Sequence, residues 1–180
     1  MSCEPWQCAE IATTKKANAI QKPEIAVAII KKAKNPVLIV GSNATERYML
    51  GKQLIEYIID FANASKIPIV ATAHMVGEFK KRGYEPAAFM NAMDISNRIV
   101  DPTWQGLDGK GHPDLVMYVA LPYYMEALIL SGLKHFAPDL KTMTLDNLFH
   151  VHASWSFPNA PLEEWANNLT VMTSKFEGGH

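Results

Sequence analysis

Cysteine is scarce in this chain, and the two that are present, Cys3 and Cys8, stand close to its start. They cannot cross-link a core elsewhere in the sequence, which excludes a disulfide framework. Two thiolates are also too few to hold an iron–sulfur cluster without ligands from another chain. The cysteine content therefore fits a reducing compartment, and we expect the protein in the cytoplasm.

An excess of charge of one sign is also missing, because 17 Lys and Arg residues face 18 Asp and Glu residues in a chain of 180. The strongly basic surface that captures nucleic acid or an anionic membrane is not expected. The apolar stretch at Ile25–Ile30 falls far short of the roughly 20 residues that a membrane-spanning helix needs. The N-terminus lacks a basic start followed by a long apolar segment, so no secretory signal is predicted.

The chain also lacks the common signatures of catalytic and cofactor sites. It contains no G-x-G-x-x-G fingerprint, H-E-x-x-H, C-x-x-C or G-x-S-x-G. The glycine run Gly106–Gly111 resembles a phosphate loop, but His112 stands where a P-loop has lysine, so we expect a surface connection. His150 and His152 have no third and fourth ligand at usable spacing, and no metal site is predicted. The residues alone do not indicate an enzyme.

Hydrophobic periodicity in the first half predicts two helices and two strands. Apolar residues repeat at helical spacing from Pro23, and Asn35-Pro36 ends this helix. Val37–Val40 is a short β-branched run, typical of a strand buried on both faces. A helix is expected over about Thr45–Ala64, followed by a strand at Ile67–Ala71.

The second half continues the alternation. The expected elements are a helix between Ala87 and Ile99, strands at Asp114–Ala120 and Leu140–Leu145 with a helix after Pro122 between them, and a last helix from Pro161. Strand–helix–strand order indicates right-handed crossovers and a parallel sheet with helices on both faces. We therefore predict one three-layer, Rossmann-like α/β domain over residues 23–180, preceded by a leader over residues 1–22.

The candidate binding residues follow the expected strands, because ligands of open parallel sheets bind beyond the carboxyl ends of the strands. They are Gly41, Ser42, Asn43, Thr72, His74, Pro122 and Tyr123. Gly41-Ser42-Asn43 presents backbone N–H groups to a phosphate in one interpretation. In the other, Gly41 makes a tight turn and Asn43 or Thr45 caps the helix. His74 either hydrogen-bonds a ligand or satisfies a loop carbonyl.

Large aromatic residues stand in or beside the expected connections: Trp104, Tyr123, Tyr124, Trp155 and Phe157. They are candidates for stacking on a ligand or for anchoring a partner protein, with ordinary packing as the alternative. Phe89, Met90 and Met93 fit a self-association surface and an internal face equally well.

Several runs, in this order along the chain, carry a resemblance to one family: Trp104–Gly111, Asp114–Val116, Pro122–Tyr124, Leu133–Phe136 and Ser156–Asn159. From about Pro23 to the last helix, the chain resembles the epsilon subunits of the archaeal acetyl-CoA decarbonylase/synthase (carbon monoxide dehydrogenase) complex. More distantly, Lys34–Gly41 and Lys66–Thr72 resemble the central domain of thiamine-diphosphate enzymes. That resemblance implies the deoxyhypusine-synthase-like NAD/FAD-binding fold with six parallel strands, two more than the periodicity indicates.

The resemblance implies a non-catalytic subunit whose partner is the large alpha subunit, which carries the nickel–iron–sulfur site. It implies that the small chain stabilises this carbon monoxide dehydrogenase component, associates with itself within the assembly, and assists electron transfer to FAD. We expect no tightly bound cofactor and no metal, with FAD as the candidate for weak binding at the residues that follow the strands. The alternative function is an independent FAD- or NAD-binding protein or small oxidoreductase.

Overall fold

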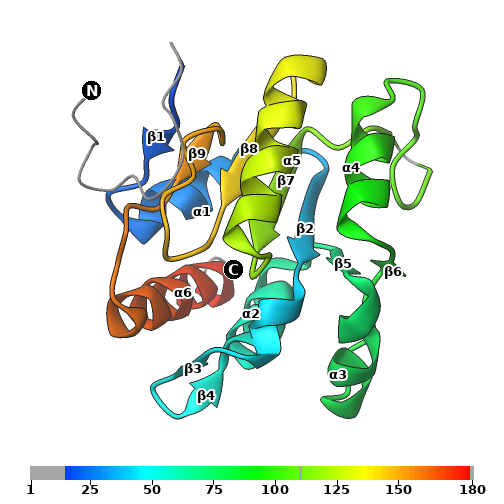
Figure 1. The fold of residues 1–180 in the computed structure, drawn as a ribbon. Helices are drawn as coiled ribbons and strands as arrows, with labels where there is room; N and C mark the ends of the chain where they lie inside the picture. The colour runs from blue at the N-terminus through cyan, green and yellow to red at the C-terminus, as the bar shows by residue number, and fades with distance from the viewer. Residues whose placement is uncertain (1–14, 110, 179–180) are drawn as a thin grey trace.

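A parallel sheet organises the chain in the structure, a computed structural model that describes residues 15–109 and 111–178 (Figure 1). Cys3 and Cys8 lie outside the described residues. The sheet order is β1-β9-β8-β7-β2-β5-β6, and every neighbouring pair is parallel. The strands are β1 (Asn18–Ala19), β2 (Pro36–Val40), β5 (Ile69–Ala71), β6 (Ala88–Phe89), β7 (Leu115–Val119), β8 (Lys141–Thr144) and β9 (Trp155–Ser156).

The strand order is that of a doubly wound fold. From β6 to β9 the six strands run 3-2-1-4-5-6 in chain order, the arrangement of dinucleotide-binding sheets, and the order reverses between β2 and β7. The four strands expected from periodicity are confirmed as β2, β5, β7 and β8. The sheet has seven strands rather than the six that the resemblance implied. The additional strands β1, β6 and β9 are two residues long, too short to show a periodic pattern.

Helices cover both faces of the sheet, as the three-layer prediction required. The helices of one face are α1 (Pro23–Lys32), α2 (Leu54–Ser65) and α6 (Leu162–Glu177), and those of the other are α4 (Ala92–Val100) and α5 (Tyr123–Phe136). The short helix α3 (Val76–Lys81) adds the buried Phe79 to the core under α1, α2 and α6. Alternate residues of β2 serve the two cores: Leu38 and Val40 pack toward α1, α2 and α6, while Val37 and Ile39 pack toward α4 and α5. Of the described helices, none is both long and apolar enough to cross a membrane.

The expected helix over Thr45–Ala64 is wrong in its first half. A short 3-10 turn, Ser42–Thr45, is followed by a hairpin of β3 (Tyr48–Met49) and β4 (Lys52–Gln53), and α2 begins only at Leu54. The hairpin turn places Leu50 and Gly51 at positive φ, which a helix excludes. The start of α2 is set by a capping box of Gln53 and Glu56. Leu50, which falls within the expected helix, stands in the hairpin turn and is 58% exposed.

The sheet also begins before the boundary expected at Pro23. Asn18–Ala19 forms β1, which pairs with β9, and the neighbouring Ala17 and Ile20 are buried. The last part of the expected leader thus belongs to the sheet. Polar and charged residues around this short strand mask its contribution in the sequence.

The ends of β2 and β7 approach each other closely at the point where the strand order reverses. A Cβ atom at Gly41 would lie 2.3 Å from the carbonyl oxygen of Ala120 and 2.6 Å from Cα of Leu121. Real Cβ atoms do not approach backbone atoms this closely. Gly41 is therefore required by packing between two turns, with its own φ at an ordinary −89°.

Substitution of Gly41 tests this contact. We expect Gly41→Ala to lower the free energy of unfolding by about 1–3 kcal/mol, because two backbone segments must separate to admit the methyl group. Gly132→Ala is the matched control, since its Cβ would meet nothing within 4 Å in the middle of α5. That variant should gain about 0.5–1 kcal/mol from helix propensity. Urea denaturation of both variants measures the difference, and equal stabilities would contradict the packing argument.

Candidate functional site

Four of the seven expected binding residues line one cavity at the carboxyl edge of the sheet. They are Ser42 after β2, Thr72 and His74 after β5, and Pro122 after β7. The cavity has a volume of about 220 Å³ and is completed by Asn91 and Ala92 at the start of α4 and by Leu121 and Met125. Ser42 and Pro122 are 80 positions apart in the sequence, yet both line this cavity, because the parallel strands that precede them end at the same edge of the sheet.

Gly41 and Asn43 do not face this cavity as free donors. The Gly41 N–H donates to Val119 O at 2.9 Å, and the Asn43 N–H donates to Ala120 O at 3.0 Å. The Asn43 side chain donates to Leu121 O at 3.5 Å. Of the two interpretations of this segment, the structure shows the tight turn. Neither Asn43 nor Thr45 caps α2, which begins nine residues beyond Thr45.

Tyr123 belongs to a different group of residues. Its hydroxyl donates to Phe149 O at 3.0 Å, and its ring stacks on the His150 ring with centroids 4.3 Å apart and an interplanar angle of 28°. His150 is buried, and its Nε2 lies 3.7 Å from Oε1 of the buried Glu126. The aromatic contact fixes the orientation of the His150 ring.

Glu126, Asp146 and His150 form a buried polar cluster, and the ligand-type atoms of their three side chains lie within 4.8 Å of one another. Both Asp146 oxygens accept the Ala120 N–H, at 3.1 and 3.0 Å, and Oδ1 lies 3.4 Å from Nη1 of Arg47. Carboxylate and imidazole groups can bind a metal ion, and among the described residues this group of three has the required spacing. The Asp146 oxygens, however, already contact the Ala120 N–H and the Arg47 guanidinium. Within the cluster, Asp146 is the residue that acts on the backbone, because it accepts the N–H of Ala120, whose φ is 62°.

Sequence reasoning found only part of this cluster. Asp146 directly follows the fourth expected strand, Leu140–Leu145, but nothing in this segment indicates that it contacts the Ala120 N–H. The spacing in the sequence pairs His150 with His152 and gives no sign of Glu126 as its neighbour. Glu126 stands in the first turn of α5, where an acidic residue is common and carries no separate signal.

A buried pair of hydroxyl groups connects strand β7 to helix α4. Tyr118 Oη lies 3.3 Å from Ser96 Oγ, and Ser96 Oγ donates to Ala92 O at 2.6 Å. Burial raises the pKa of the Tyr118 phenol, so the hydroxyl stays neutral and serves as a hydrogen-bonding group.

Most of the aromatic residues in connections are packing residues. Phe157 is buried, Trp155 packs against the core under α1 and α6, and Trp104 makes an edge contact with the His112 ring at 6.2 Å. Tyr124 differs, because it is 68% exposed on the outer face of α5. It is the aromatic residue of this set that remains available to a partner.

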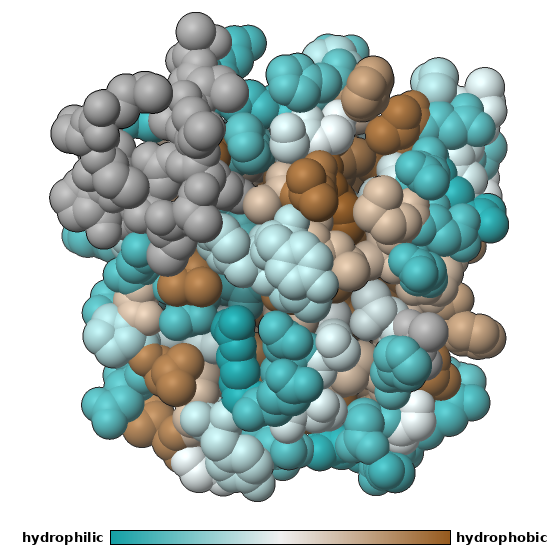
Figure 2. All heavy atoms as spheres, in the orientation of Figure 1, coloured by the Kyte–Doolittle hydropathy of each residue, from teal (hydrophilic) through white to brown (hydrophobic). Residues whose placement is uncertain are grey.

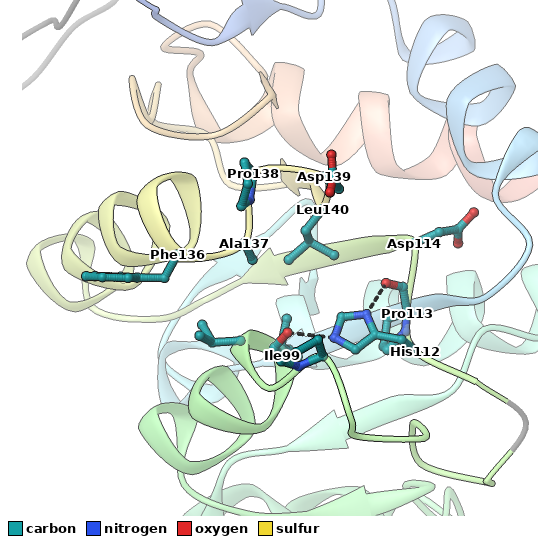
Figure 3. Close-up of a pocket in the computed structure, with 11 residues that line it drawn as sticks. Ile99, His112, Pro113, Asp114, Phe136, Ala137, Pro138, Asp139 and Leu140 are labelled. Atoms are coloured by element: carbon teal, nitrogen blue, oxygen red, sulfur yellow. Dashed lines mark hydrogen bonds between the residues drawn. The ribbon is translucent and has the colours of Figure 1, made fainter.

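A second cavity, of about 390 Å³, lies between the carboxyl ends of α4 and α5 (Figure 3). The His112 ring forms part of its wall, with Nε2 2.7 Å from Ile99 O and Nδ1 2.9 Å from Pro113 O. Gly111 O accepts a hydrogen bond from the Asn35 side chain at 2.6 Å. The glycine-rich connection thus stands before β7, at the edge opposite the strand ends, as the sequence indicated.

The role of Asp146 is testable by its removal. Asp146→Ala leaves the buried Ala120 N–H without an acceptor, and we expect it to lower the free energy of unfolding by about 1–3 kcal/mol. Asp60→Ala is the control, because Asp60 and its partner Lys52 are both about half exposed, and its effect should stay within about 0.5 kcal/mol. Denaturation in urea at pH 7 gives both values. A loss no larger than that of the control would show that the cluster does not hold the Ala120 turn.

The chain is similar to proteins that are named as subunits of one enzyme complex. It is 36% identical over 168 residues to the acetyl-CoA decarbonylase/synthase complex subunit epsilon of Methanothermobacter thermautotrophicus, which covers 93% of both chains. The subunit epsilon of Methanothrix soehngenii is 34% identical over 86% of this chain and 80% of that protein. Subunit epsilon 1 of Archaeoglobus fulgidus shows the same identity and coverage.

Among solved structures, the TrkA-N domain of the inner membrane protein ybaL from Escherichia coli is 15% identical. The match covers 77% of this chain and 82% of that chain. Its TM-score of 0.36 is too low to support any argument about the binding site. A sequence model of one family matches residues 1–173. On that match and on the identities to the archaeal subunits, the chain belongs to the family described as CO dehydrogenase beta subunit/acetyl-CoA synthase epsilon subunit.

Proposed function

We propose that this protein is a non-catalytic subunit that binds the large nickel–iron–sulfur carbon monoxide dehydrogenase subunit and stabilises that component of the complex. The support comes from family membership together with the outer face of α5. The relatives are named as subunits of a complex, and they match the chain over most of its length. A subunit of this kind needs an exposed apolar surface, because burying such a surface against a partner stabilises the complex.

The outer face of α5 has the properties of such a surface. Tyr124, Leu128 and Phe136 are 68%, 71% and 73% exposed. From Tyr123 to Leu133 the helix carries a single charged residue, Glu126, and that side chain is buried. Figure 2 shows hydrophobic side chains gathered over α5 and beside α4 on the side facing the viewer.

An uncharged helix face with large exposed side chains is unusual on a protein that stays alone in water. Charged residues are depleted and aromatic residues enriched at the centre of protein–protein interfaces. Exposed apolar patches of this kind commonly mark interaction sites. The α5 face is therefore the surface that we assign to the large subunit.

Size-exclusion chromatography with light scattering tests the association under anaerobic conditions. The chain and the large subunit should co-elute as a complex of defined stoichiometry, and the isolated chain should not oxidise carbon monoxide. The large subunit should also withstand heating longer when it is bound. Separate elution of the two chains, or carbon monoxide oxidation by the isolated metal-free chain, would refute the proposal.

A charged substitution on α5 tests the assigned surface. Leu128→Lys should weaken binding of the large subunit at least about tenfold, because it places an ammonium group where an apolar side chain is buried on association. The folded chain should tolerate it, since Leu128 is exposed. Tyr48→Ser is the matched control, because Tyr48 is 64% exposed on the hairpin after β2. If the control weakened binding and Leu128→Lys did not, the interface would lie elsewhere.

The 3-2-1-4-5-6 strand order favours a second candidate, weak FAD binding at the carboxyl edge with assistance to electron transfer. The residues present do not fit an enclosed dinucleotide, because the Gly41 and Asn43 amides are hydrogen-bonded within the chain. Any flavin would lie over the rim of the cavity. Titration of flavin fluorescence decides the question: saturable quenching supports this candidate, and no quenching at near-millimolar protein removes it.

A further inference from the structure

We propose that the cavity lined by Ser42, Thr72, His74 and Asn91 binds the phosphoryl group of a small phosphate ester. This inference does not depend on association with the large subunit. It assigns a small terminal phosphate to this edge of the sheet rather than the pyrophosphate of a dinucleotide.

Polar side chains from three separate segments line the cavity. Ser42 follows β2, Thr72 and His74 follow β5, and Asn91 precedes α4. Within the described residues, the Ser42 and Thr72 hydroxyls and the His74 ring form no hydrogen bond, so their donors serve water or a ligand. The Asn91 Oδ1 accepts the Met93 N–H at 2.9 Å, which leaves its NH₂ group as a donor.

The electrostatics of the cavity favour an anion. Its eight lining residues include no carboxylate. The amino end of α4, a helix of nine residues, stands at the cavity through Asn91 and Ala92 and adds a partial positive charge. Hydroxyl, amide and imidazole donors approach from several directions, which suits a tetrahedral oxyanion. No arginine lines the cavity to form the bidentate pair typical of a planar carboxylate site.

The size of the cavity limits the ligand. Its volume of about 220 Å³ is below the roughly 300–1,000 Å³ of pockets for drug-sized molecules. Leu121, Pro122 and Met125 form an apolar wall beside the polar residues. A phosphoryl group would contact the polar residues, and a few attached carbon atoms would contact the apolar wall. A dinucleotide is too large for the volume of this cavity.

The cavity is held in shape without a ligand. Gly41 packs against the Ala120–Leu121 backbone, and Asp146 holds the Ala120 N–H. These contacts fix Ser42 relative to Leu121 and Pro122 across the sheet edge. Donors that are already in place lose little conformational entropy on binding, which favours affinity even without a lysine or arginine.

An NMR titration of the full chain at constant ionic strength tests the proposal. Inorganic phosphate and glycerol phosphate are the probes, with acetate, glycerol and chloride as comparisons. We expect saturable shifts of the backbone amides of Ser42, Thr72, His74 and Asn91, and tighter binding of glycerol phosphate than of inorganic phosphate. Shifts that fail to saturate, or acetate binding as tight as that of phosphate, would overturn the assignment.

Hydroxyl deletions localise the effect. Ser42→Ala and Thr72→Val should each weaken glycerol phosphate binding about tenfold, the loss expected for one hydrogen bond to a charged group. Ser174→Ala, on α6 at the other face of the sheet, is the matched control and should bind as the parent chain does. Unchanged affinity in both cavity variants would refute the site. Association with the large subunit should persist in these variants, so failure of the phosphate site is distinct from failure of the proposed function.

Discussion

The structure depends on the contact between the turn after β2 and the turn after β7. Gly41 admits the Ala120 carbonyl to a distance that excludes any side chain, and the Asn43 N–H donates to that same carbonyl. The Asp146 carboxylate holds the Ala120 N–H from the other side. Ala120 adopts a left-handed conformation that alanine rarely takes, and these three contacts compensate its cost. The central strands of the sheet are thereby joined at their carboxyl ends.

This contact divides the carboxyl edge into two regions with different chemistry. On the side of β5 the turns leave a small cavity with polar donors and an apolar wall. On the side of β8 they close over Glu126, Asp146 and His150, which are buried. In a dinucleotide-binding protein the crevice lies between the first and fourth strands. Here the two turns contact each other at that point, and the Gly41 and Asn43 N–H groups donate to Val119 O and Ala120 O within the chain.

Helix α5 begins at the carboxyl edge of the sheet and exposes one side to solvent. It begins at Tyr123, over the buried cluster, and ends at Phe136, beside the second cavity. Its inner side packs on the sheet through Ile129, Leu130 and Leu133, and its outer side is apolar as well. Tyr124, Leu128 and Phe136 on the outer side are exposed, while Lys134 and His135 stand in the last turn of the helix. Exposed apolar side chains of this kind commonly mark interaction sites, which is the support that α5 gives to the proposed association with a larger subunit.

The sequence by itself determined the class of the fold, four of its strands and five of the six α-helices that the structure describes, because apolar periodicity and strand-end turns are local signals. It also indicated the family, and it located Ser42, Thr72, His74 and Pro122 at the edge where they meet. Only the tertiary structure decided that Gly41 packs against the Ala120 turn with its N–H bonded to Val119 O, that a hairpin replaces the start of the expected helix, and that Glu126, Asp146 and His150 converge. These features arise from contacts between distant segments, and neither spacing nor composition within one segment records them.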